Sequence, residues 1–494
     1  MQNPDDFSLL QSNDKTFTKL HLHLQVDNIP TTDWYNLRTA IEENTNVREV
    51  HIQMTKEFVE AFPLNQLLEL SKAIGSLASL KYLLLGQMNG QVIDFGYIPI
   101  QAITVMLQHA GEKLLWWMLR GLVMTHIYKG SDEESEDKSG ILLPTSQHRS
   151  QRESGKEKKK KDSKDKKKKK SSKKSSKKDK KMDESSKKQN YSASSGVTSI
   201  SSSSCQASQA LDTKQAAAKR AWEKLGDTIL VLKHLKRCSL MGHFDDCLYG
   251  CSLDPLLEGL GALEELEVLM TAITRHEGRI GVDPSALGTF LDGASEQLKQ
   301  VNIIYIDLTD DHIDEVASAL TKKEHLEELT LSGPGPADGG SVTAESIGAL
   351  LRAPYLKTLK LPELVLDDAS VVAVCIALAR CSNLQSLEVK CNLQSLELLA
   401  LQQMLVLNQG LETLYLHLTG LGSESAALDI VTILFSNAKS KLQKLVLEGE
   451  DTNEDCKKLR KIDISEWEEV IEGFFTATTS ETERTRLVTL SRVI

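Results

Sequence analysis

Four side chains that can bind a metal lie within a short segment near the middle of the chain. They are Cys238, His243, Cys247 and Cys251, with the spacing C-x4-H-x3-C-x3-C. Tetrahedral zinc needs four such ligands that converge on one point. The spacing is not that of a familiar zinc motif, and Cys238 stands where related segments carry an inward-facing leucine. We therefore predict structural cysteines here and no metal site.

Three histidines form a second candidate site near the N-terminus. His21 and His23 are two residues apart in an expected strand, so both point to one face. His51 is expected beside His21 on the next strand. Aligned imidazoles can hold a metal, but no further ligand is visible nearby. We interpret His21 and His51 as part of a solvated polar face that is available to a partner.

Signatures of catalysis and of phosphate binding are weak. The glycine-rich segment 332–341, SGPGPADGGS, has neither a Lys-Ser/Thr ending nor a G-x-G-x-x-G pattern, so we interpret it as a loop. The chain shows no nucleophile with a neighbouring base and no paired carboxylates in a convincing context. The sequence therefore predicts a protein that is not an enzyme and needs no cofactor.

A lysine tract could bind a polyanion. Residues 156–188 hold 19 lysines, six acidic residues and no arginine, so this segment carries +13 while the remainder carries −23 of the net −10. Its two uninterrupted runs are Lys158, Lys159, Lys160, Lys161 and Lys166, Lys167, Lys168, Lys169, Lys170. Without arginine or aromatic residues, any nucleic-acid contact would be independent of sequence and sensitive to salt. The runs also fit nuclear-import signals, and a solubilising spacer remains an alternative.

The tract lies inside a longer segment that lacks apolar periodicity. Residues 130–212 also contain the acidic cluster SDEESED (131–137) and the serine-rich stretch SASSGVTSISSSS (192–204). Such a composition offers too little apolar surface to offset chain entropy. We predict that this segment is a disordered insertion.

A motif of the form L-x-x-L-x-L recurs on both sides of this insertion. Its copies are FTKLHL (17–22), VREVHI (47–52), LKYLLL (80–85), LLWWML (114–119), LKRCSL (235–240), LEELEV (263–268), LKQVNI (298–303), LEELTL (326–331), LKTLKL (356–361), LQSLEV (384–389), LETLYL (411–416) and LQKLVL (442–447). Within each block, consecutive copies start 27 to 35 residues apart. The insertion therefore interrupts one loop of a single continuous array.

Each copy predicts a strand that is followed by a helix. Alternating Leu-x-Leu places apolar residues on one face of the strand, and Leu329, Leu359, Leu387 and Leu414 should be buried equivalents. Between copies, apolar residues recur with a helical period, as in Ile313, Val316, Ala317 and Leu320. The apolar faces can be buried only against neighbouring units, so stacking is obligatory.

These repeats resemble the leucine-rich-repeat family, specifically its ribonuclease-inhibitor-like branch with units of about 28 residues. The resemblance covers residues 17–125 and 220–490. It implies an α/β solenoid, a curved horseshoe with parallel strands on the concave face and helices outside, that binds proteins. It does not imply a chemical activity. The Asn or Cys that the family often places eight residues after the first Leu is present only as Asn392.

The expected organisation has four parts. About four units occupy residues 1–129, the disordered insertion 130–212 follows, and about eight units occupy 213–464. Residues 465–494 should form a cap. In this cap, Ser465 begins a helix with an apolar stripe of Trp467, Val470, Ile471 and Phe474, and LVTL (487–490) forms a last strand.

Residues two, four and six places after the first Leu should line the concave face. The third and fourth units place Tyr82, Leu84, Trp116 and Met118 on adjacent strands, with Arg120 at the edge. This composition is typical of an interface hot spot. Later strands should present polar sets such as Glu265 with Glu267, apart from the aromatic Tyr415. The alternatives are that the insertion covers the aromatics, or that a register slip turns Trp116 inward in place of Trp117.

Composition and the lack of targeting signals limit the class of protein that the sequence can encode. The 494 residues are 40% hydrophobic, which suits a sizeable core. No secretory signal or run of roughly 18 apolar residues is present, and the eight cysteines are irregularly spaced. These features predict an intracellular protein, cytoplasmic or nuclear, without a transmembrane segment.

The leading functional hypothesis is a non-enzymatic scaffold that binds an unidentified protein on the concave face. An alternative is a nuclear or nucleic-acid-associated adaptor that uses the lysine tract for polyanion contact. A third hypothesis is a small-GTPase regulator, since Ran GTPase-activating proteins share the repeat architecture. A fourth, a ubiquitin-ligase adaptor, would need a helical box before the repeats, yet the first strand is expected near Phe17.

Overall fold

A computed structural model describes residues 4–29, 32–86, 96–124, 202–244, 251–275, 278–279, 281–304, 306, 308–333, 342–421, 429–430, 441–450, 475–481 and 485–492. The chain divides into one unit formed by Met1–Lys129 with Gln206–Ile494 and a second formed by Gly130–Cys205. The fold below is that of the first unit. The lysine tract and most of the expected insertion lie outside the described residues.

The strands are β1 (Lys19–Leu24), β2 (Glu49–Met54), β3 (Tyr82–Gly86), β4 (Gly96–Pro99), β5 (Trp116–Met124), β6 (Arg237–Phe244), β7 (Val268–Arg275), β8 (Gly278–Arg279), β9 (Gln300–Ile304), β10 (Glu328–Ser332), β11 (Thr358–Leu366), β12 (Ser386–Leu393), β13 (Thr413–Leu421), β14 (Lys444–Glu450), β15 (Phe475–Glu481) and β16 (Thr485–Arg492). The helices are α1 (Pro4–Gln11), α2 (Trp34–Glu43), α3 (Lys56–Ala61), α4 (Leu64–Ser76), α5 (Ile100–Ala110), α6 (Ser202–Ile229), α7 (Asp254–Gly261), α8 (Pro284–Gly293), α9 (Asp310–Leu320), α10 (Ala344–Leu351), α11 (Asp368–Leu378) and α12 (Ser395–Leu407), with short 3₁₀ helices at Val26–Asn28 and Gly111–Lys113.

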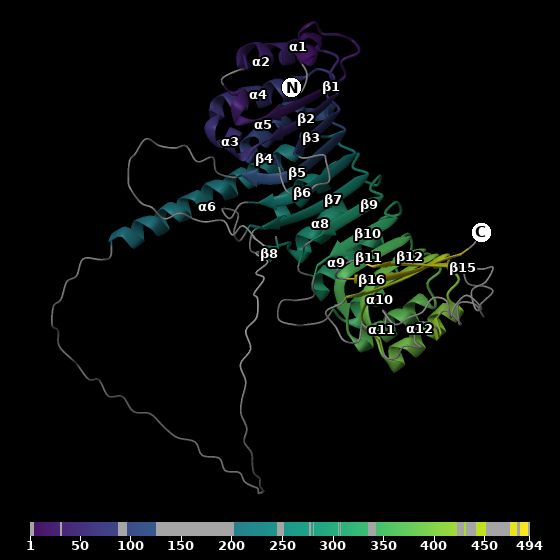
Figure 1. The fold of residues 1–494 in the computed structure, drawn as a ribbon. Helices are drawn as coiled ribbons and strands as arrows, with labels where there is room; N and C mark the ends of the chain where they lie inside the picture. The colour runs from purple at the N-terminus through teal and green to yellow at the C-terminus, as the bar shows by residue number, and fades with distance from the viewer. Residues whose placement is uncertain are drawn as a thin grey trace, which may run out of the picture. The chain divides into compact units, whose positions relative to one another are not determined.

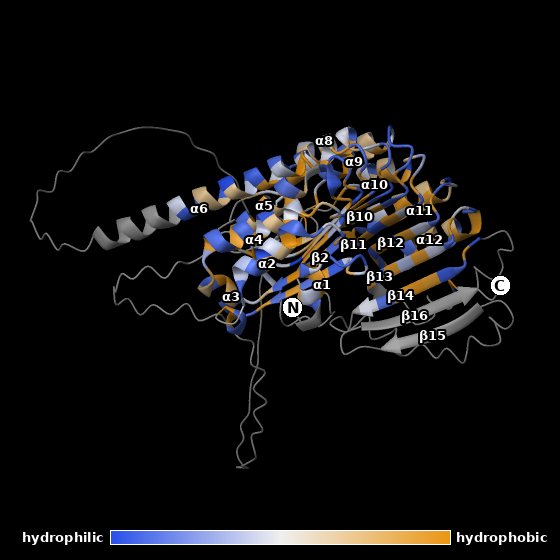
Figure 2. Ribbon diagram, turned by 90° about the horizontal axis from the view of Figure 1, so that it is seen from above, coloured by the Kyte–Doolittle hydropathy of each residue, from blue (hydrophilic) through white to orange (hydrophobic). Residues whose placement is uncertain are grey.

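Within the described residues the strands form one open sheet of 16 strands. From β1 to β14, the repeat strands pair in parallel in chain order. Two short strands lie outside this order: β4 pairs in parallel with the last four residues of β5, and β8 pairs antiparallel with the last two residues of β7. Helices α7 to α12 pack against one another in sequence along one side of the sheet (Figures 1 and 2). The chain is therefore an α/β leucine-rich-repeat solenoid, as the repeats predicted. No helix within the described residues is long and apolar enough to cross a membrane.

The array continues across the insertion. Strand β5 pairs directly with β6, with Trp116 opposite Arg237 and Trp117 opposite Cys238. Helix α6 leads into β6 and begins at Ser202, so the range 202–212, expected as the end of the insertion, is helical. Trp222 of this helix is buried, and its indole nitrogen donates to the carbonyl of Ser252 at 2.8 Å.

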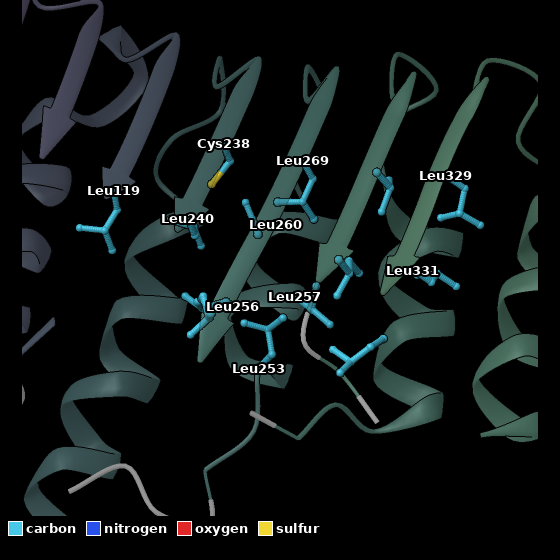
Figure 3. Packing of buried hydrophobic residues seen from close by; sticks show 14 of the residues in the cluster. Leu119, Cys238, Leu240, Leu253, Leu256, Leu257, Leu260, Leu269, Leu329 and Leu331 are labelled. Carbon is cyan, nitrogen blue, oxygen red and sulfur yellow. The ribbon is translucent and has the colours of Figure 1, made fainter. Parts of the chain in front are cut away.

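Inward-facing leucines of successive strands form the core between sheet and helices. Leu329, Leu359, Leu387 and Leu414 are opposite one another in register and at most 1% exposed, which confirms their equivalence. Figure 3 shows the same arrangement earlier in the array, where strand leucines point towards the leucines of α7. Each unit therefore buries its apolar face against the units beside it.

The sixth unit is out of the expected register. The sequence LEELEV (263–268) fits the motif, but the strand starts at Val268, and Leu269 lies opposite Cys238. The true copy begins at Leu266 and has Thr271, which is buried, at its third apolar position. Leu263 instead belongs to the turn after α7, where its amide donates to the carbonyl of Leu260. The expectation that Glu265 and Glu267 line the strand face is therefore wrong.

Side chains that come just before the strands satisfy polar groups of several turns. Asn44 and Asn408 each stand three residues before a motif and are almost fully buried. The amide of Asn408 donates to Leu378 and Cys381, and its oxygen accepts from backbone amides at positions 410 and 411. Ser295 and Lys323, at the same place in their units, also donate to turn carbonyls.

At the C-terminal end, β16 pairs antiparallel with β14 and β15. The strand expected at 487–490 lies within β16. The helix expected from Ser465 lies outside the described residues.

Candidate functional site

The side of the sheet opposite the helices, here called the open face, is formed by alternate residues of every repeat strand. The first residues of successive strands lie in one row: Lys19, Glu49, Tyr82, Trp116, Arg237, Val268, Gln300, Glu328, Thr358, Ser386, Thr413 and Lys444. The row two residues further along is His21, His51, Leu84, Met118, Ser239, Met270, Asn302, Thr330, Lys360, Glu388, Tyr415 and Val446.

The predicted aromatic pair sits on this face. Tyr82 lies opposite Trp116, with their ring centroids 6.0 Å apart and the rings nearly perpendicular. Both side chains are half-buried, whereas Trp117 faces the core and is 0% exposed. The register slip that would turn Trp116 inward is therefore absent. Edge-to-face rings of this kind hold each other in place and present a rigid apolar surface.

Leu84 differs from the expectation of an exposed contact. It has the register position of an open-face residue but is only 4% exposed. Most of its surface is thus covered by neighbouring residues. Leu84 therefore offers a partner little contact area. Met118, its neighbour on β5, remains half-exposed.

The corrected register of β7 adds residues that the sequence reasoning missed. Val268 and Met270 take the places assigned to the two glutamates, and both are half-exposed. Met241 of β6 and Ile304 of β9 lie on either side of Ala272, two residues further along β7, and are also half-exposed. We call the combined set the apolar centre of the open face: Tyr82, Leu84, Trp116, Met118, Met241, Val268, Met270, Ala272 and Ile304.

Two arginines and one buried amide lie among or beside these apolar residues. Arg237 separates Trp116 from Val268 in the first row, and Arg120 lies opposite Met241. Arg120 is half-exposed and Arg237 is exposed, and neither forms an ion pair within the part of the chain that the structure describes. Asn302 follows Met270 in its row and is 8% exposed, and its buried side-chain oxygen has no hydrogen-bond partner within the described residues. A buried acceptor without a donor costs free energy.

The N-terminal end of the open face is polar. Glu49 bridges the Nζ of Lys19 at 2.8 Å and the Nε2 of His51 at 2.6 Å. His21 and His51 are adjacent, with ring centroids 4.4 Å apart. Partial burial lowers the pKa of His21, and the neighbouring His51 adds to this effect. Within the described residues no group of three or more metal-ligating side chains converges.

The cysteine candidate also shows no metal geometry in its described part. Cys238 is 1% exposed in the core, and burial raises the pKa of its thiol far above the ordinary value. Cys251 is half-exposed, and Cys247 lies outside the described residues. The interpretation of Cys238 as a core residue is confirmed.

A hydrogen-bonded cluster occupies the C-terminal end of the open face. Tyr415 donates its hydroxyl to Oε2 of Glu448 at 2.5 Å. His417, two residues later, contacts Glu388 at 2.8 Å through Nε2 and Glu448 at 2.9 Å through Nδ1. The cluster links β12, β13 and β14. Sequence reasoning found Tyr415 alone, because its partners lie on neighbouring strands about 30 residues away.

Comparisons of the whole chain with known proteins find similarity at the level of solved structures. No family model matches the chain, and no curated protein matches it in sequence. Among solved structures, it is similar to a chain in the crystal structure of the Rad7 and Elc1 complex in yeast. The two are 14% identical, the match covers 87% of this chain and 76% of that chain, and the TM-score is 0.35. A likeness at this level supports no conclusion, so the assignment of the fold rests on strand order and register, and the ribonuclease-inhibitor-like branch stays a prediction.

Proposed function

We propose that this protein is a non-enzymatic interaction scaffold and that its protein partner binds the open face at the apolar centre. The observation that carries the proposal is the register of β3, β5, β6, β7 and β9, which places the apolar side chains on neighbouring strands of the same face, around Arg237 and Ser239 of β6. Aromatic residues, methionine and arginine are enriched at the buried centres of protein interfaces. The partner would cover this surface and compensate the polar groups around it.

The polar groups around the centre favour a specific partner over a non-specific one. Arg120 and Arg237 can donate several hydrogen bonds each. A partner that placed a carboxylate or carbonyl acceptor at either arginine would gain affinity.

The test is affinity capture with the double variant Tyr82→Ala, Trp116→Ala of the full chain. The variant removes two half-buried rings from the open face, so partner capture should fall at least tenfold, about 1.4 kcal/mol, while the melting temperature changes little. The matched control is Thr358→Ala with Ser386→Ala, which lies in the same row outside the apolar centre. Met270→Lys should weaken capture as strongly, because it places a charge in the centre.

Two results would count against the proposal. Large destabilisation of the double variant without a specific loss of binding would mean that Tyr82 and Trp116 act as core residues. Equal loss of capture in the control pair would place the partner elsewhere on the face. Contact of the lysine tract with a polyanion stays a prediction. Its test is a comparison of the localisation of the full chain with that of a variant that lacks residues 150–190.

A further inference from the structure

The outer helices near the C-terminal end of the array expose apolar side chains. On α12, Leu396, Leu399, Val406 and Leu407 are 49% to 62% exposed, and Ile376 on α11 is 55% exposed. Helix α9, by contrast, presents exposed acidic residues and begins with Asp310 and Asp311. Helices α11 and α12 are hydrophobic along most of their length (Figure 2). Exposed apolar surface of this extent is typical of an interaction site.

A groove of about 610 Å³ lies between α10 and α11 on this side of the sheet. Its lining includes the small residues Ala344 and Gly348 from α10 and Ala373 and Ala377 from α11, here called the small-residue floor, together with Leu351. Ile376 forms part of its wall. Small residues leave room for the backbone of another helix to approach closely, so the shape suits a helix better than a flat surface.

The groove is positively charged. Arg352 ends α10 and Arg380 follows α11, and both line the groove with exposed guanidinium groups. No acidic side chain lines it, and neither arginine forms an ion pair within the described part of the chain. Arginine binds carboxylates through two parallel hydrogen bonds. The groove therefore lacks the carboxylates that would complement it.

We propose that this groove binds an amphipathic helix of a partner protein, one that carries glutamate or aspartate beside a stripe of large apolar residues. The apolar stripe packs on the small-residue floor and against Ile376, and the carboxylates meet Arg352 and Arg380. This is the helix-in-groove mode of recognition. The site is on the helix side of the sheet, opposite the open face, so it is independent of the function proposed above.

A native thiol reports on occupancy of the groove. Cys381 lines it, is half-exposed, and is free. Cys251 is also half-exposed but does not line the groove. The probe is a synthetic helix of about 14 residues, about 21 Å long, with leucines on one face and glutamates beside them. Labelling of the full chain with N-ethylmaleimide, followed by mass spectrometry, measures both cysteines.

The glutamate peptide should slow labelling of Cys381 about tenfold and leave Cys251 unchanged. A peptide with lysine in place of each glutamate should not protect the thiol. In the variant Arg352→Glu, Arg380→Glu the preference should reverse, so that the lysine peptide protects and the glutamate peptide does not. The control variant Lys72→Glu, Lys224→Glu changes the net charge equally at exposed positions of α4 and α6 and should behave as the parent chain.

Three outcomes would overturn the proposal. Equal protection by both peptides would show that charge plays no part, and absence of protection by either would show that the groove binds no helix of this kind. If the full chain self-associates in sedimentation and Arg352→Glu, Arg380→Glu makes it monomeric, the occupant is a second copy. Variants of Tyr82 and Trp116 should leave the protection intact.

Discussion

The direction in which a strand residue points decides whether it stabilises the array or is available to a partner. In β12, Leu387, Val389 and Cys391 face the core and are buried, while the intervening Ser386 and Glu388 are half-exposed on the open face. Burial, with a smaller effect of Cys375, raises the pKa of Cys391 to about 12. This thiol is therefore an inert core group near neutral pH.

Truncation of one inward leucine should be costly. Leu387→Ala leaves a cavity between sheet and helices, and we expect a loss of about 2–5 kcal/mol of unfolding free energy in denaturant titrations. Ser386→Ala, the adjacent open-face residue, should change it by less than about 0.5 kcal/mol. Equal effects of the two substitutions would contradict the register of β12.

The Tyr415 cluster should make stability depend on pH in the alkaline range. Partial burial, then the hydrogen bond to Glu448 and the negative charge of that carboxylate, raise the pKa of Tyr415 above its usual value. A group whose pKa is raised on folding stabilises the fold below its unfolded pKa, about 10, and loses this contribution as pH rises through the folded pKa.

The variant Tyr415→Phe isolates this effect because phenylalanine cannot ionise. The melting-temperature difference between parent and variant should be constant from neutral pH to about pH 9 and should shrink above about pH 10. Melting curves that stay parallel over the whole range would mean that the Tyr415 hydroxyl does not ionise in contact with Glu448.

At the scale of single elements, each unit depends on how its strand is entered and left. Side chains before the strands satisfy turn carbonyls, as Asn408 does, and Thr309 and Thr343 begin helices by accepting a backbone hydrogen bond. At the end of β3, Gly86 has a φ of +103°. A Cβ there would lie 1.7 Å from the carbonyl oxygen of Arg120.

Gly86→Ala should therefore force β3 and β5 apart at this point. We expect a loss of about 1–3 kcal/mol or more, measured by thermal or denaturant unfolding. Gly281→Ala is the control, because nothing lies within 4 Å of a Cβ at that position, and its effect should stay within about 0.5 kcal/mol. An unchanged stability for Gly86→Ala would mean that the two backbones are not in close contact.

At the scale of the whole molecule, the repeats on either side of the insertion form one sheet. The amides of Lys236 and Arg237 donate to the carbonyl of Leu115, just as the amides of Lys81 and Tyr82 donate to Arg48 in an uninterrupted part of the array. Helix α6 belongs to this array, because Trp222 and Leu225 are buried in its core.

Replacement of residues 130–201 by a short Gly-Ser linker should leave cooperative unfolding intact. Each doubling of loop length changes the closure free energy by only about 0.6 kcal/mol. Deletion of 130–229 is the contrasting variant, since it also removes the buried face of α6 and should lower the melting temperature sharply. Loss of cooperative unfolding in the shorter deletion would make the insertion part of the fold.

The repeat pattern was enough to predict the architecture. An inward leucine must be buried and an alternating strand has only two faces, so Leu387 and Leu414 could be aligned, and Tyr82 and Trp116 placed on the same face, without coordinates. The pattern failed at the sixth unit, where both Leu263 and Leu266 could begin the motif. A local pattern of apolar residues cannot separate the last leucine of a turn from the first of a strand when they are three apart.

The neighbours of each open-face residue could be identified only from the tertiary structure. The link from Tyr415 and His417 to Glu388 and Glu448, the burial of Leu84, and the arginine-lined groove between α10 and α11 all join residues from different units. Loops of different length separate those units, so the register between strands is set by backbone hydrogen bonds across the sheet. Periodicity along the chain predicts on which face of the sheet a residue lies. Its neighbours on that face are determined by how the units stack.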